Sequence, residues 1–273
     1  MRWCRFQDGE RARYGVIEGD TVIGVDGEPW GAYTRTGSAH PLASTKLLVP
    51  VIPPTFYAAG LNYREHVTEV AKTQGIEPAF PPHADVGYRA NNALIADGEE
   101  IVIPRDATEL VQYEGELVAV FERQCRRVSE AEALDHVFGY TIGNDVSERT
   151  WQRDDRTFFR SKNTDTFKPM GPWIETDLDP AALGVTIRLS GREVGHYRVA
   201  DAIFSLQQFI SRTSDYVTLF PGDVIWMGTD GATENIQDGD VVEIEVPGIG
   251  VLRNPVVKER CSPARNPRSL RGA

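Results

Sequence analysis

The sequence predicts a mainly β protein with a few helices, in the α+β class. Short runs rich in β-branched and aromatic residues recur along the chain, and Gly, Pro, Asp or Asn bounds most of them. Helical patterns are few by comparison. Strand and helix patterns do not alternate regularly, and no repeat of fixed period is present, which disfavours a Rossmann or TIM-barrel architecture.

The first 50 residues predict a small N-terminal β domain. The segments "RYGVIEG" and "DTVIGVDG" alternate apolar and polar residues and are punctuated by Gly and Asp, which is typical of β-hairpins. Pro50, Pro53 and Pro54 then mark a boundary, because proline cannot continue a helix. We therefore expect domains over residues 1–50 and 51–260.

The larger domain reads as strands interrupted by three helical segments. Residues 62–75, "NYREHVTEVAKTQG", have helical propensity and end in glycine. We expect this helix at the surface, because it would have little apolar face to bury. Residues 129–139 and 201–214 also have helical patterns. The tail, 261–273, is basic and contains proline, so we expect it to be disordered. The predicted strand regions are 93–97, 99–104, 110–121, 185–190, 222–229 and 240–252.

Composition excludes some classes of partner. The chain has 273 residues, with 40 acidic against 29 Lys and Arg, giving a net charge of −11. Such a balance argues against nucleic acid as a partner. No apolar run reaches the roughly 18 residues needed to cross a membrane, and the first residues lack a signal peptide's apolar core. Three scattered cysteines without CxxC spacing suggest reduced thiols in the cytoplasm.

The stretch "YEGEL" places two carboxylates in an otherwise apolar strand pattern. Glu114 and Glu116 would project from the same face of a strand. They would repel one another, about 7 Å apart, unless a cation or solvent intervenes. Asp145 follows another β-like run and adds a third carboxylate. Together the three predict a site for a hard cation, Mg²⁺ or Mn²⁺. From the spacing of the two glutamates alone, an exposed sheet face that binds no metal is the alternative.

The order of six motifs resembles the fumarylacetoacetate hydrolase family. The match runs in order from about residue 55 to residue 256, and its motifs read "GLNYREHVTE", "YEGELVAVF", "GYTIGNDVSER", "RSKNTDTFKPMGPWI", "LFPGDVIWMGT" and "IGVLRN". The resemblance implies a mixed β-roll catalytic domain, preceded by a small N-terminal segment, and a homodimer. It also implies a divalent metal, usually Mg²⁺, bound by Glu114, Glu116 and Asp145.

The resemblance also implies roles for other residues. His66 and Glu69 match a family pair in a segment that is often a lid. By hypothesis Glu69 orients His66, which takes a proton from water. Lys162 matches a lysine that faces the ligand. The residues matched to supporting or substrate-binding positions are Gln152 and Thr229. Without the family motifs, His66 and Lys162 would be read as solvated surface residues.

Two departures from the family pattern bear on the substrate. Arg89 stands where many relatives have lysine, and its planar fork suits a second carboxylate or a polar tail. Asp230 replaces a proline beside the expected substrate and would disfavour a dianionic tail.

The function that the sequence favours is Mg²⁺-dependent hydrolysis of a C–C bond in a 2,4-dioxo acid of the acylpyruvate type, a small-molecule 2-oxo acid. The alternatives within the family are an oxaloacetate-type decarboxylase and a 2-hydroxy-dienoate isomerase or hydratase. An alternative of another class is a non-catalytic β protein that binds a metal or ligand.

Overall fold

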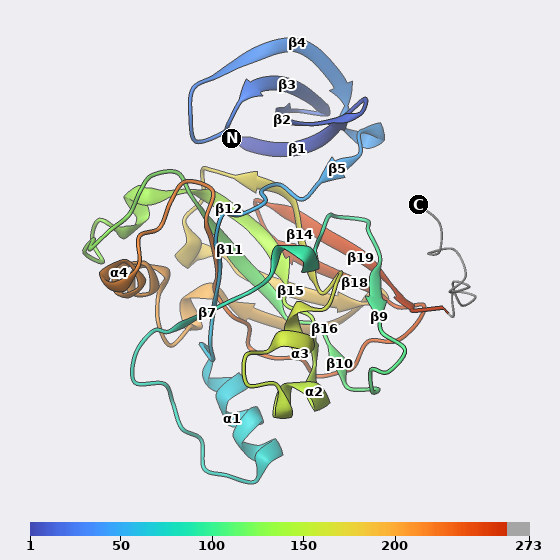
Figure 1. Ribbon diagram of the computed structural model, residues 1–273, viewed down its shortest axis with the longest axis vertical. Helices are drawn as coiled ribbons and strands as arrows, with labels where there is room; N and C mark the ends of the chain where they lie inside the picture. The colour runs from blue at the N-terminus through green and yellow to red at the C-terminus, as the bar shows by residue number, and fades with distance from the viewer. Residues whose placement is uncertain (261–273) are drawn as a thin grey trace, which may run out of the picture.

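A computed structural model describes residues 1–260 (Figure 1) and confirms the mainly β fold. The tail predicted to be disordered, 261–273, lies outside the described residues. Twelve strands form one large mixed sheet, in the order β4-β3-β2-β1-β14-β12-β11-β17-β6-β7, with β5 beside β1 and β8 beside β14. A second sheet has the order β16-β15-β18-β19-β9, and β10 pairs with β13.

The N-terminal hairpins extend the large sheet. Their strands lie at one end of the molecule, at the top of Figure 1. Gly9 and Gly19 have positive φ in the turns that close the first two hairpins, as the hairpin pattern requires. Strand β1 pairs with β14 through two residues, and the α-amino group of Met1 lies 2.5 Å from Glu175. These strands are β1 (Arg2–Asp8), β2 (Arg11–Glu18), β3 (Thr21–Gly27), β4 (Tyr33–Pro41) and β5 (Leu47–Leu48).

Strand β11 (Gly115–Phe121) lies within the large sheet and is buried on both faces. Leu117, Ala119 and Phe121 belong to one apolar cluster, and Val118 and Val120 to another on the opposite face. This explains the nearly continuous apolar run, because a strand covered on both faces does not alternate. The other strands of the large sheet are β6 (Phe56–Ala59), β7 (Val86–Tyr88), β8 (Leu94–Ile95), β12 (Val137–Asn144), β14 (Lys168–Glu175) and β17 (Val224–Trp226).

The second sheet covers one face of β11. Its apolar residues, among them Ile187 and Ile244, join the cluster that contains Leu117. Burial of this alternating face holds the two sheets together. Its strands are β9 (Ile101–Ile103), β15 (Gly184–Leu189), β16 (Arg192–Arg198), β18 (Val241–Val246) and β19 (Gly250–Lys258), and the separate pair is β10 (Val111–Gln112) and β13 (Ser147–Glu148).

Within residues 1–260, four α-helices lie around the sheets. Helix α1 (Arg64–Gln74) agrees with the helix predicted over 62–75, and α4 (Leu206–Tyr216) with that over 201–214. Two short helices, α2 (Arg149–Asp154) and α3 (Phe159–Asn163), were not predicted. No helix within residues 1–260 is long and apolar enough to span a membrane.

The helix predicted over 129–139 is wrong. Only Ala133–His136 form a 3₁₀ turn, and strand β12 begins at Val137. Pairing with β11 and β14 on either side satisfies the backbone of β12, and this tertiary context overrides the local helical preference.

Candidate active site

The register of β11 with β12 brings the three predicted acids together. Gly115 pairs with Asn144, and Glu116 with Gly143, so Asp145 follows directly opposite Glu114. The N–H of Asp145 donates to the carbonyl of Glu114 (2.8 Å), and the N–H of Glu114 donates to the side-chain oxygen of Asn144 (2.9 Å). These bonds fix the two backbones just beyond the strand ends.

The glycine in "EGE" explains why the two glutamates share a face. A Cβ on Gly115 would lie 2.9 Å from Ile187 Cγ1 and 3.1 Å from Ile244 Cγ2, both in the second sheet. Gly115 therefore lies on the tightly packed face, and the alternation of the strand places Glu114 and Glu116 on the other. The "EGE" pattern combines close sheet packing with two carboxylates directed away from it.

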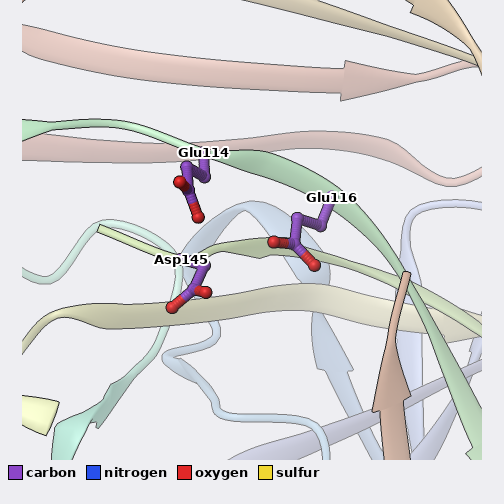
Figure 2. A group of neighbouring side chains, drawn as sticks. All are labelled: Glu114, Glu116 and Asp145. Carbon is purple, nitrogen blue, oxygen red and sulfur yellow. The ribbon is translucent and has the colours of Figure 1, made fainter. Parts of the chain in front are cut away.

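The three carboxylates converge on one buried space (Figure 2). Ligand oxygens of Glu114, Glu116 and Asp145 lie within 4.8 Å of one another. Glu116 accepts a hydrogen bond from the N–H of Gly228 (2.8 Å), yet burial and the charges of Asp145 and Glu114 raise its pKa to about 8. A divalent cation would relieve this repulsion, and an all-oxygen ligand set suits Mg²⁺ or Mn²⁺. The residues fit the predicted metal.

Asp145 is surrounded by three cations. Arg89 donates to it through Nε (3.2 Å) and Nη2 (2.9 Å), Lys162 Nζ lies 2.8 Å from Oδ2, and Lys168 Nζ lies 2.7 Å from Oδ1. Burial alone would raise the pKa of Asp145, but Arg89, Lys162 and Lys168 together hold it well below its usual range. Asp145 is therefore ionised throughout the physiological pH range.

Glu114 is paired with two further groups. Lys162 Nζ lies 2.5 Å from one carboxylate oxygen, and Arg149 Nη1 lies 2.7 Å from the other. Burial opposes ionisation, but Lys162 and Arg149 lower the pKa of Glu114. Four cations thus pair with Glu114 and Asp145, whereas Glu116 forms no ion pair with a Lys or Arg among the described residues.

His66 lines the same cavity as the acids. It comes from α1, and burial lowers its pKa to about 4, so the imidazole is neutral near pH 7. A Cβ on Gly231 would lie 2.7 Å from His66 Nδ1, so the glycine leaves the space that the ring occupies. A neutral imidazole can accept a proton.

The other predicted residues divide into two groups. Lys162, Gln152 and Thr229 line the cavity, and Gln152 also accepts a hydrogen bond from Arg149 (2.9 Å). Glu69 and Asp230 are not among the lining residues. The side chain of Glu69 is exposed, so its pairing with His66 stays a prediction.

Arg89 lines the cavity but is bound to Asp145 and to the carbonyl of Tyr88 (3.1 Å). Each nitrogen of the Arg89 guanidinium already donates to a protein oxygen, so in this arrangement the side chain does not offer two free donors to a substrate carboxylate. Asp230 is partly buried, and burial together with Glu65 raises its pKa to about 6.

Three residues of the site have no role predicted from the sequence. Arg149 ends the motif "NDVSER", but an arginine there is typical of an exposed residue as well as of a site residue. Lys168 is a charged residue in the largely apolar run "TFKPMGPWI", and the same sequence signal marks Glu114 and Glu116. Phe158 lines the cavity, but no sequence signal distinguishes it from a surface aromatic.

Comparisons with known proteins agree with this geometry. A family model described as the C-terminal domain of fumarylacetoacetate (FAA) hydrolase matches residues 55–257, and a model described as Rv2993c-like, N-terminal, matches residues 1–50. Protein Rv2993c of Mycobacterium tuberculosis is 37% identical, covering 95% of this chain and 99% of its own.

Solved structures show the same fold. A 5-carboxymethyl-2-hydroxymuconate delta-isomerase from Mycobacterium smegmatis has a TM-score of 0.85 and 37% identity, covering 95% of this chain and 100% of its own. A maleylpyruvate hydrolase from Sphingobium sp. SYK-6, in complex with manganese (II) ion and pyruvate, has a TM-score of 0.76 and 26% identity over 95% of this chain and 100% of its own. Names of relatives include hydrolases, isomerases, decarboxylases and a tautomerase.

Proposed function

This chain belongs to the fumarylacetoacetate hydrolase family and is an enzyme, and we propose that it is a Mg²⁺-dependent hydrolase of 2,4-dioxo acids of the acylpyruvate type. Mn²⁺ would be the alternative metal. One observation supports this most strongly. A single cavity is lined by the three converging carboxylates, by the neutral His66 and by Lys162.

The charges favour an anionic substrate. Four cations surround Glu114 and Asp145, so a divalent ion bound by the triad would give the site as a whole an excess of positive charge. The carboxylate of a 2-oxo acid would be attracted to this field. Bound there, the metal would polarise the neighbouring keto oxygen as a Lewis acid.

The side chains can then perform hydrolysis. His66 takes a proton from water, whose oxygen attacks the C4 carbonyl carbon of the substrate. The C3–C4 bond breaks, and its electron pair passes to the C2 keto oxygen as an enolate. Lys162 stabilises this negative charge through its ammonium group. Proton return to C3 gives pyruvate, and the acyl fragment leaves as a carboxylic acid.

A second candidate is the decarboxylase or isomerase chemistry of other family members. The exposed position of Glu69 favours it, because a base without its orienting partner is less suited to activating water. Decarboxylation of oxaloacetate needs an electron sink for the enolate but no activated water.

The test is an assay of 2,4-dioxopentanoate cleavage and oxaloacetate decarboxylation, with Mg²⁺ and with chelator. Wild type is compared with His66→Ala, and His83→Ala, an exposed histidine, is the control. We expect chelator to abolish both activities, and His66→Ala to lower cleavage by about 100-fold or more while decarboxylation changes little.

Two results would contradict the proposal. Turnover of oxaloacetate without cleavage of 2,4-dioxopentanoate by wild type would favour the second candidate. Cleavage that persists in chelator would remove the metal from the mechanism.

A further inference from the structure

The mouth of the cavity is apolar, in contrast to its charged interior. Leu61 and Phe158 line the cavity, and their exposures are 38% and 37%. The smaller Ala59, Gly60 and Gly87 also contribute to the lining. A substrate whose 2-oxo acid end lies at the carboxylates would place its other end against these residues.

Phe158 is held there at a conformational cost. Its backbone has φ 54° and ψ 29°, the left-handed region that bulky side chains avoid, at about 1–2 kcal/mol. Hydrogen bonds maintain the conformation, because its N–H donates to Asp155 O (3.2 Å) and its carbonyl accepts from Asn163 Nδ2 (2.7 Å). The ring lies 5.9 Å from the Arg89 guanidinium. A strained backbone that keeps an aromatic ring partly exposed at a cavity is a functional indication.

No described cation at the cavity is free to bind a second carboxylate. Arg89 uses Nε and Nη2 on Asp145 and Nη1 on the carbonyl of Tyr88. Lys162 contacts Glu114 and Asp145. Arg149 does not line the cavity, and it contacts Glu114 and both Gln112 and Gln152.

An acid lies near the cavity instead. Asp230 directly follows Thr229, which lines the cavity, and Glu65 is close enough to raise the pKa of Asp230. Near pH 7 both acids would repel a negatively charged substrate tail.

We propose that this enzyme selects substrates whose distal acyl group is apolar, and that Phe158 and Leu61 are the residues that determine this specificity. The inference rests on the proposed function for the identity of the 2-oxo acid end. It assigns Arg89 to holding Asp145 and not to recognition of a second carboxylate.

The kinetic test uses two substrates that differ only at the far end. 2,4-Dioxoheptanoate ends in a methyl group, and 2,4-dioxoheptanedioate ends in a carboxylate. We expect kcat/KM to be at least about tenfold higher for the monoacid. Phe158→Ala and Leu61→Ala should each reduce this ratio severalfold, whereas Tyr216→Ala, an aromatic 72% exposed on α4, should not change it.

A binding test separates this inference from the proposed reaction. 2-Oxoheptanoate and 2-oxoheptanedioate lack the C4 carbonyl and are not cleaved, so calorimetry with Mn²⁺ present measures their affinities whichever reaction the enzyme catalyses. The monoacid should bind at least about tenfold more tightly, and Phe158→Ala should narrow the difference.

Equal or tighter binding of the diacid would overturn the inference, as would a preference that Phe158→Ala and Leu61→Ala both leave unchanged. Failure to cleave 2,4-dioxopentanoate, with the binding preference intact, would instead contradict the proposed function alone.

Discussion

Lys168 shows how this site stabilises charges away from water. The side chain is fully buried, and its ammonium donates to the carbonyls of Val146 (3.0 Å) and Phe167 (2.8 Å) as well as contacting Asp145. All three ammonium hydrogens therefore have acceptors. Burial lowers the pKa of Lys168 to about 8, and Asp145 opposes that shift. Lys168 fixes one carboxylate oxygen of Asp145 and so positions the other.

Replacing this lysine should destabilise the protein strongly. Lys168→Met leaves the buried carboxylate of Asp145 with one fewer cation and takes the lysine donor from the carbonyl of Val146, whereas the carbonyl of Phe167 keeps the N–H of Val146 (3.1 Å). We therefore expect the free energy of unfolding to fall by about 3–5 kcal/mol. Urea denaturation measures the change. The control is Lys46→Met, which removes an exposed pair with Glu99 at 3.7 Å and should cost less than about 1 kcal/mol. Similar losses for both variants would contradict the role given to Lys168.

His66 predicts a specific pH dependence of stability. Its pKa is about 4 in the folded protein, below the 6.5 of a free histidine, so the unfolded chain binds a proton first as the pH falls. The contribution of His66 to the free energy of unfolding is therefore fully present above pH 6.5 and is lost as the pH falls from 6.5 to 4. At pH 5 the free energy of unfolding should be lower by about 2 kcal/mol on this account alone.

The measurement compares unfolding free energies at pH 7.5 and pH 5 in wild type and His66→Gln. The drop should be smaller by about 2 kcal/mol in the variant. The corresponding replacement of the exposed His196 is the control. An equal drop in wild type and His66→Gln would show that His66 is not held neutral.

At the scale of elements, the site depends on how closely β12 approaches its neighbours. Gly143 pairs with Glu116 across the strands, and a Cβ there would lie 2.6 Å from the ring of Trp226. Trp226 is fully buried and packs on Phe56, with ring centroids 4.9 Å apart, so the ring has no space into which to move.

A methyl group at this position should therefore disturb the fold. We expect Gly143→Ala to lower the free energy of unfolding by about 1–3 kcal/mol, because overpacking shifts strand β12. Thermal or urea unfolding measures this change. Gly31→Ala is the matched control, because its nearest neighbour to an added Cβ is 3.8 Å away. Unchanged stability of Gly143→Ala would show that β12 can move without cost.

Local patterns predicted strand β11 and the shared face of Glu114 and Glu116, because side-chain alternation is a property of the extended chain itself. The strand predicted over 110–121 is divided into β10 and β11, and Glu114 lies just before β11. Local patterns failed for residues 129–139, where the end of the segment pairs within the large sheet. They also did not predict the cations around Asp145. Arg89 precedes Asp145 by 56 residues, and only the tertiary fold brings the two together.

For the whole molecule, the two sheets and the joined N-terminal strands form the frame that holds the acids. The resemblance in six motifs predicted the family, which the comparisons confirm. The domain boundary at residue 50, the homodimer and the cytoplasmic location stay predictions. Sedimentation velocity tests the dimer directly, with about twice the chain mass of 30.3 kDa expected.

A divalent ion bound by Glu114, Glu116 and Asp145 is central to the proposed chemistry. Glu116 offers the cleanest test, because it forms no ion pair with a Lys or Arg within residues 1–260, so its replacement by Gln breaks none of the ion pairs of the site. Calorimetry should be done with Mg²⁺ and Mn²⁺ on wild type, on Glu116→Gln, and on the variant with all three acids replaced by amides.

Wild type should bind one ion per chain, Glu116→Gln should bind it at least about tenfold more weakly, and the triple variant should show no binding. Absence of binding to wild type, or equal affinity in wild type and Glu116→Gln, would contradict the central claim.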